Sequence, residues 1–129
     1  MKNIFQQVYC LYSFNKDEID WAGTSRVGFF KTLIDLKHNN KALWNGRNGG
    51  FIQKISTGHD DKVYAFMREK EGDKVVGIFN MKNVAVNINL EGSAFIGDYK
   101  NVFTNEKHPL SIGTNFLLKP YEFYVLSNK

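Results

Sequence analysis

The chain has one cysteine and no long apolar segment, and each shortage excludes a class of protein. A single thiol, Cys10, cannot form an intramolecular disulfide, so the fold does not depend on a disulfide framework and the redox compartment stays open. No cluster of His, Asp or Glu surrounds Cys10, which predicts a small buried hydrophobe and not a nucleophile. The N-terminal segment lacks an apolar run long enough for a signal peptide or a membrane span. We therefore expect no membrane partner, and a cytoplasmic protein unless an export signal lies upstream.

A concentration of charge of one sign is also missing. The net charge is +4, but the Lys residues stand singly among acids and form no basic stripe, so no nucleic-acid partner is expected. The three histidines, His38, His59 and His108, lie far apart, show no metal-ligand spacing, and have the polar neighbours typical of surface side chains. The chain is thus expected to hold no metal and no cofactor.

What the chain does have is enough apolar and aromatic material for one packed domain. It has 129 residues, 43% of them hydrophobic and 15% aromatic, with eleven Phe and six Tyr. That composition argues against disorder and favours sheet. The length suffices for one real core but is too short for a (β/α)8 barrel, which needs roughly 250 residues.

The segment Val63–Asn80 carries the clearest local signal. Two stretches of alternating apolar and polar residues flank the letters EGDK, which predicts a β-hairpin. Gly72 and Asp73 fit the centre of a two-residue type II′ turn, with Gly at the first position.

The rest of the chain after residue 50 also has a period of two. We expect strands near 50–56, 62–70, 74–80, 84–90, 98–104, 115–119 and 121–127. In 84–90 one face, from Val84 to Leu90, is apolar and the other polar, which is typical of an antiparallel sheet with one solvated side. Six or seven short strands at this spacing predict a sandwich or barrel.

A helix precedes the strands. Apolar residues recur at helical spacing from Val27 to Leu36, Thr24 or Ser25 is a candidate cap, and Asn39 and Asn40 supply a stop. The apolar arc is broad enough to need more than one neighbour, and the sheet of this chain can cover only part of it. We therefore expect exposed apolar side chains on this helix.

Four separate segments match one family in the right order. FNKDEIDW at Phe14–Trp21 is similar to the loop FFxKDxIDW, and Phe30–Gly46 to the helix and exit fykkLiaLRkknpAlxxG, except that Lys41 stands where Pro is usual. Val63–Asn80 resembles the hairpin aFxRexxgdkvlvvxN, and Leu118–Leu126 the closing strand LxPyeyxvl. Together they resemble the end of the α-amylase family of glycoside hydrolases, from the last part of the catalytic barrel through the C-terminal β-domain.

That resemblance implies a mainly β fold: an antiparallel Greek-key sandwich preceded by a loop and one helix left over from a (β/α)8 barrel. Residues 1–47 would be the end of the barrel and residues 48–129 the β-domain. The partner would be the catalytic barrel of a retaining enzyme that acts on α-glucosidic linkages, with α-glucan as a second possible contact. Self-association through the exposed helix, residues 25–39, is a further expectation.

No catalytic residue is assigned, because no residue matches the family's nucleophile, general acid or stabilising carboxylate motifs. A retaining mechanism needs two carboxyls about 5 Å apart on a rigid scaffold. Asp17, Glu18 and Asp20 are close in sequence but lack the spacing and the glycine of a calcium loop, which favours a solvated loop. The resemblance places this loop on the catalytic face, so Asp17 and Trp21 are the candidate substrate contacts, with Trp21 equally compatible with packing.

Other aromatic residues are interpreted as structural. Trp44 should fill the seam between helix and sheet, and Tyr99, Tyr121 and Tyr124 should pack on sheet faces. Asn80 should close the turn that follows its strand. Two alternatives stay open: a free-standing carbohydrate-binding module, which needs converging exposed aromatic residues, and a protein-interaction domain unrelated to sugars.

Overall fold

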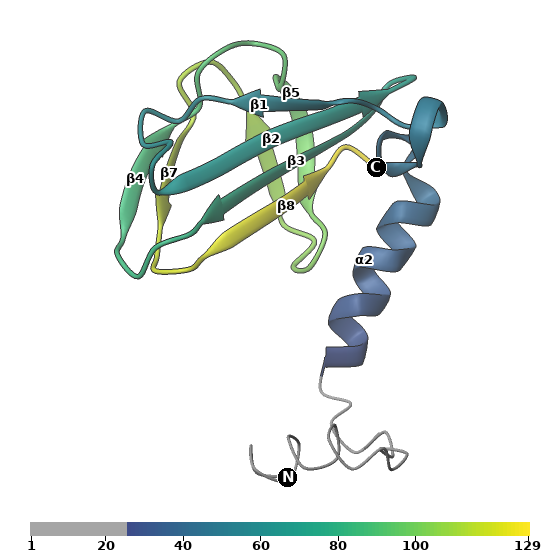
Figure 1. Cartoon of the computed structure of the whole chain (residues 1–129), viewed down its shortest axis with the longest axis horizontal. Helices are drawn as coiled ribbons and strands as arrows, with labels where there is room; N and C mark the ends of the chain where they lie inside the picture. Colours follow the sequence, from purple (N-terminus) through teal and green to yellow (C-terminus); the bar gives the residue numbers. More distant parts are fainter. Residues whose placement is uncertain (1–25) are drawn as a thin grey trace, which may run out of the picture.

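The computed structural model describes residues 26–129, which build two antiparallel sheets packed face to face (Figure 1). The larger sheet has the strand order β1-β2-β3-β8-β5-β6, and the smaller one pairs β4 with β7. The strands are β1 Ile52–Ile55, β2 Val63–Lys70, β3 Asp73–Asn80, β4 Val86–Asn89, β5 Gly97–Asn101, β6 Lys107–Leu110, β7 Asn115–Leu118 and β8 Phe123–Ser127. The chain leaves the large sheet after β3, and β8 returns between β3 and β5. The predicted mainly β, Greek-key sandwich is confirmed.

Some expectations lie outside the described residues: those for Cys10, Asp17 and Trp21, and the candidate helix caps Thr24 and Ser25. In the described part, no helix has both the length and the apolar character that crossing a membrane requires.

The main core fills the space between the two sheets. Ile78 of β3, Leu118 of β7 and Leu126 of β8 are fully buried there. Burying a side chain of this size contributes about 1.5–3 kcal/mol. The alternation predicted for 84–90 holds from Val86 onward, but Val84 precedes β4 and is exposed, contrary to expectation.

The turn of the leading hairpin is shifted by one residue from the prediction. Lys70 pairs with Asp73, so the two central residues are Glu71 and Gly72 and not Gly72 and Asp73. Both have positive φ, 52° and 87°, which makes a type I′ turn. The shift places Asp73 in β3, where its side chain is buried.

Of the hairpin formed by β5 and β6, only the first strand was predicted. The strand expected over 98–104 ends at Asn101, whose side-chain oxygen accepts hydrogen bonds from the backbone N–H groups of Phe103 (2.9 Å) and Thr104 (3.4 Å) and so starts a turn. The following strand β6 was not predicted, and it contains Pro109. It lies at the edge of the sheet, where a missing N–H is tolerated.

Asn80 and two of the tyrosines behave as expected. The Asn80 amide donates to the carbonyl oxygens of Val84 (2.7 Å) and Lys119 (2.9 Å), joining the segments that leave β3 and enter β8. Tyr99 is buried and Tyr124 packs against the core. The expectation for Tyr121 is wrong, because this residue has a φ of 56° in the turn before β8 and is exposed.

The helix α2 spans Val27–Asn39 and runs down beside the sandwich (Figure 1). It ends at the predicted residue, but by another mechanism: Asn40 is extended and its side-chain oxygen accepts from the Ala42 N–H at 3.0 Å. Arg26 is the N-cap and makes no side-chain cap bond. Two short 3-10 helices follow, η2 Lys41–Leu43 and η3 Gly46–Asn48, and lead into β1.

Buried polar groups fasten the end of α2 to the sheet. Asp73 accepts hydrogen bonds from the Lys41 backbone N–H at 2.8 Å and from the Lys129 Nζ at 3.1 Å. Asn40 donates from Nδ2 to Ser127 Oγ at 3.1 Å. The bond from the Lys41 N–H, followed by that from Lys129, holds the pKa of the Asp73 carboxyl below its usual range. We call Asn40, Asp73, Ser127 and Lys129 the polar latch.

The latch predicts a pH-dependent contribution to stability. Because the pKa of Asp73 is lowered on folding, its stabilisation is present above the unfolded carboxyl pKa of about 3.9 and is lost as the pH falls through the lower folded value. At neutral pH, Asp73→Asn should lower the free energy of unfolding by about 1–3 kcal/mol, and the difference from the parent chain should shrink below about pH 4. Urea unfolding at both pH values measures this.

Asp98→Asn is the matched control, since Asp98 is exposed on β5. It should leave the stability unchanged at both pH values. A deficit in Asp73→Asn that is equally large at low and neutral pH would contradict the latch.

Candidate functional site

The strands β2, β3 and β8 carry apolar side chains on both faces of the large sheet. One set points into the core, and the other points to the opposite side, which we call the outer face. On the outer face the register aligns two cross-strand rows. The first row is Tyr64, Phe79 and Phe123, and the second is Phe66, Gly77 and Val125.

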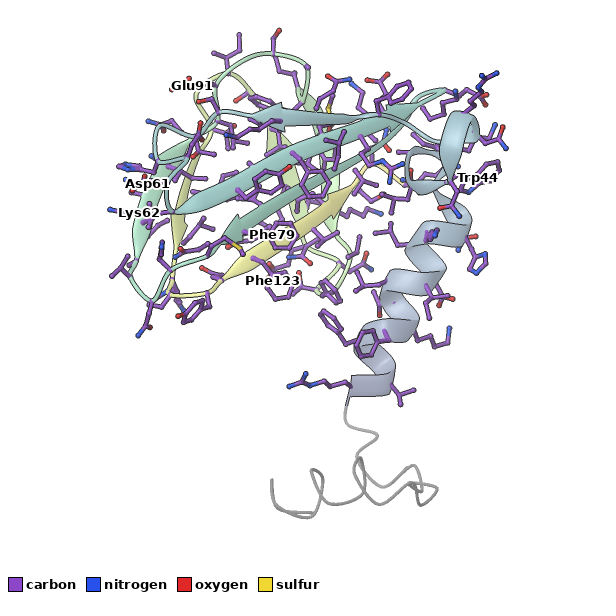
Figure 2. All side chains as sticks on the ribbon, in the orientation of Figure 1. Trp44, Asp61, Lys62, Phe79, Glu91 and Phe123 are labelled. Atoms are coloured by element: carbon purple, nitrogen blue, oxygen red, sulfur yellow. The ribbon has the colours of Figure 1, made fainter. Side chains whose placement is uncertain are left out.

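Aromatic rings cover much of the outer face. Phe66 and Phe79 are nearly parallel with centroids 6.1 Å apart, and Phe79 and Phe123 follow at 6.0 Å. Phe103 meets Phe123 edge-on at 5.8 Å and stacks on Phe29 of α2 at 4.9 Å. Figure 2 labels Phe79 and Phe123, which lie side by side on neighbouring strands. The array links the sheet to the helix, each pair adding about 0.5–1.5 kcal/mol beyond area burial.

The helix α2 touches the sheet with one side only. Leu36 packs against the small apolar cluster under the helix, and Phe29 stacks as described above. Val27, Phe30 and Ile34 form a second stripe at i, i+3 and i+7, and Phe30 and Ile34 are 55% and 54% exposed. No residue of α2 is buried. The expected exposure of apolar side chains on this helix is confirmed, although Leu36 itself is partly covered.

A groove of about 360 Å³ separates α2 from the outer face. Its apolar lining is Leu33, Leu36, Leu43, Phe66, Val75, Phe79 and Val125. Its polar lining is Lys37, Asn45 and Arg68. A groove with this composition suits an apolar protein segment, because it offers few hydrogen-bonding groups to a sugar.

The chemistry of catalysis is not assembled in the described part of the chain. Residues 26–129 contain no group of three or more His, Cys, Asp or Glu placed to hold a metal ion. Three carboxyl pKa values in this part of the chain are lowered, all by structural contacts. They belong to Asp73 in the latch, to Asp60, mainly through the Thr57 backbone N–H, and to Glu71, mainly through the hydrogen bond from Lys41. Burial raises the pKa of Tyr99 to about 12, which leaves this core hydroxyl protonated.

Besides those for Val84 and Tyr121, two further sequence interpretations of single residues are wrong. Trp44 does not fill the seam between helix and sheet: it is 40% exposed, and its indole N–H donates to the His38 carbonyl at 3.4 Å. His108 is not a surface residue: its ring packs against Phe116 and Tyr124 at the edge of the core.

The outer face was missed by sequence reasoning, although a signal for it exists. Tyr64 and Phe66 on β2, and Val75 and Phe79 on β3, occupy positions that a one-sided strand would fill with polar residues. Apolar residues on both faces indicate a strand that is covered twice. The candidate contacts Trp21 and Asp17 lie outside the described residues.

Gly77 allows the two central rings to approach each other. A Cβ at this position would lie 2.7 Å from a ring atom of Phe66 and 2.8 Å from one of Phe79. Gly77→Ala should therefore lower the free energy of unfolding by about 1–3 kcal/mol through overpacking. Gly28→Ala is the control, because its Cβ meets open space in a helix and should stabilise by about 0.5–1 kcal/mol. A Gly77→Ala chain as stable as the parent in urea would contradict the packed array.

The sequence and the fold of the chain are similar to those of known proteins. The family profile described as "Maltogenic Amylase, C-terminal domain" matches residues 52–125. Among curated protein sequences no relative matches. Solved structures with the same fold include a noncanonic maltogenic α-amylase, AmyB, from Thermotoga neapolitana, with a TM-score of 0.64 and 12% identity over 88% of this chain. AmyP in complex with maltose has a TM-score of 0.61 and 17% identity over 78% of this chain.

A trehalulose synthase mutant, MutB A258V, also shares the fold, with a TM-score of 0.55, 17% identity and 78% of this chain covered. The matches span 30% of AmyB, 20% of AmyP and 17% of MutB, so in each of them the fold is one part of a longer chain. Because the family profile covers more than half of the described chain, the protein belongs to the maltogenic amylase C-terminal domain family of the α-amylase-type glycoside hydrolases.

Proposed function

We propose that this chain is the non-catalytic, architectural end of an enzyme acting on α-glucosidic linkages, and that its outer face and α2 dock onto the catalytic (β/α)8 barrel. The observation that carries the proposal is the incompletely covered outer face. The inner face of the large sheet is covered by β4 and β7, whereas the outer face and the far stripe of α2 expose large apolar side chains. Contiguous apolar patches of this kind mark interaction sites.

The division of the chain is part of the proposal. We place the end of the barrel at residues 1–47 and the β-domain at residues 48–129. The support is the element order: the helical elements end with η3 at Asn48, and every later element is a strand. The polar latch would keep α2, as the last barrel helix, at a defined position on the sheet.

The docking is tested in a joined polypeptide in which a catalytic (β/α)8 barrel precedes this chain in frame. Phe123→Glu places a charge on the outer face. Because Phe123 also contacts Phe29, Phe79 and Phe103, its effect on the isolated chain is measured as well and subtracted. Phe123→Glu should lower the melting temperature of the joined polypeptide and the maltoheptaose-hydrolysing activity that remains after heating. Leu117→Glu is the control, because Leu117 is 69% exposed on the small sheet and should change stability by less than about 0.5 kcal/mol. Equal effects of both variants would refute the proposal.

We further propose that the isolated chain self-associates through the far stripe of α2, since Phe30 and Ile34 otherwise face water. The pair Phe30→Glu and Ile34→Lys removes both apolar groups and adds a helix-compatible ion pair at i, i+4. In sedimentation velocity, the parent chain should show concentration-dependent association that this double variant loses. An identical profile for both chains would contradict self-association.

We also propose that α-glucan contact belongs to the joined enzyme, with Trp21 and Asp17 as the contacts this chain contributes. The isolated chain should show no glucosidase turnover and should bind maltoheptaose with a dissociation constant of roughly millimolar or weaker, because one stacked ring gives little surplus over the cost of association. Tryptophan fluorescence and amide shifts report the binding. Low-micromolar saturation abolished by Trp21→Ala would favour a carbohydrate-binding module.

A further inference from the structure

The groove between α2 and the outer face has charge of one sign only. Lys37 and Arg68 line it, and no acidic residue among residues 26–129 does. In residues 26–129 neither of these cations forms an ion pair with a carboxylate, whereas Lys31, at the other side of α2, pairs with Asp35 at 2.5 Å. The groove therefore presents positive charge beside its apolar lining.

Arg68 is held in place by the chain that leaves α2. Its Nε donates to the Gly50 carbonyl at 2.8 Å, and one terminal nitrogen donates to the Trp44 carbonyl at 3.1 Å. Both acceptors are neutral, so the guanidinium keeps its full charge, and no further acceptor in the described part of the chain binds its other donors. A fixed guanidinium loses little conformational freedom on binding, which favours a carboxylate in a defined position.

The two ends of the groove differ in polarity: one end is aromatic, and the other carries the positive charges. Phe79 lies toward one end, near Phe123, while Trp44, whose carbonyl binds Arg68, lies at the junction with α2 (Figure 2). An occupant with only apolar side chains would strip water from the Lys37 and Arg68 charges without pairing them, which is costly. An occupant with apolar side chains along the groove and a carboxylate beside Lys37 and Arg68 would match both the apolar lining and the two positive charges.

We infer that the groove receives an amphipathic helix whose apolar stripe lies on Leu36, Phe66 and Phe79 and whose last turn carries Asp or Glu against Lys37 and Arg68. A helix C-terminus adds negative partial charge at the same end. Helix-in-groove recognition uses apolar residues at i, i+3 and i+4, which α2 and the outer face can enclose from two sides. The inference rests on the proposed docking function and specifies the chemistry of the docked segment.

The test uses the isolated chain and two synthetic amphipathic helical peptides as probes. The peptides share one leucine stripe and differ only in the last turn, which carries two Glu in one and two Gln in the other. Binding is followed by methyl and amide shifts of Leu36, Val75 and Val125 and by Trp44 fluorescence. The Glu peptide should bind about tenfold tighter at low salt, and the ratio should fall as salt is raised.

Charge variants of the chain distinguish carboxylate recognition in the groove from unspecific attraction between the positively charged chain and the Glu peptide. Lys37→Glu should bring the ratio of the two affinities close to one. Lys107→Glu is the control, because it makes the same change of net charge on the edge strand β6 and should preserve the ratio. Both side chains are exposed, so the fold should persist in each variant.

Equal affinities for the two peptides, no shift in the groove at any soluble peptide concentration, or equal effects of Lys37→Glu and Lys107→Glu would each overturn the inference. Peptide-induced chemical-shift changes confined to Val27 and Ile34, which belong to the far stripe of α2, would also overturn the inference. If Lys37→Glu abolishes self-association but not peptide discrimination, a second copy of this chain occupies the groove, and the inference fails. The Phe123→Glu experiment in the joined polypeptide is independent, so failure of the general docking proposal is distinguishable from failure here.

Discussion

Burial on both faces of β2, β3 and β8 is the constraint on which the rest of the structure depends. Their inner residues, such as Ile78 and Leu126, form the sandwich core with the small sheet. Their outer residues, such as Phe79 and Phe123, would face water if nothing covered them, and α2 covers only part of that area. A sheet with two apolar faces must be covered on both sides. In the described chain the small sheet covers the inner face, whereas α2 covers only part of the outer face.

The polar latch makes the partial covering by α2 possible. Apolar contacts alone would let the helix slide over a smooth aromatic surface, because dispersion and area burial have little directionality. Hydrogen bonds from Asn40 to Ser127 and from Lys41 to Asp73 have a defined geometry and fix where the helix ends. The groove and its positive end follow from that position, since the same connection brings the Trp44 carbonyl to Arg68.

The chain segments differ in how well their structure could be predicted. The helix end and most strands were expected, because hydrophobic period and polar stop residues act over short distances. The turn at Glu71 and Gly72 was misplaced by one residue, since EGDK allows either pair of central residues and the pairing of β2 with β3 decides. Strand β6 was not predicted; it contains Pro109, whose missing N–H is acceptable only because the strand lies at the sheet edge. Trp44 was assigned to the core from its size and its position after Leu43 at the helix-to-sheet crossing, but the structure leaves it 40% exposed.

The sequence by itself determined the fold class, the family and the existence of an incompletely covered helix, because alternation, helical spacing and ordered motifs are local properties of the chain. Only the tertiary structure decided which aromatic residues meet on the outer face, that Gly77 permits their contact, and that Lys37 and Arg68 lie at one groove. These features join residues from β2, β3, β8 and α2, which are far apart in the chain. Strand register and the position of the helix bring them together, and neither is encoded in any single segment.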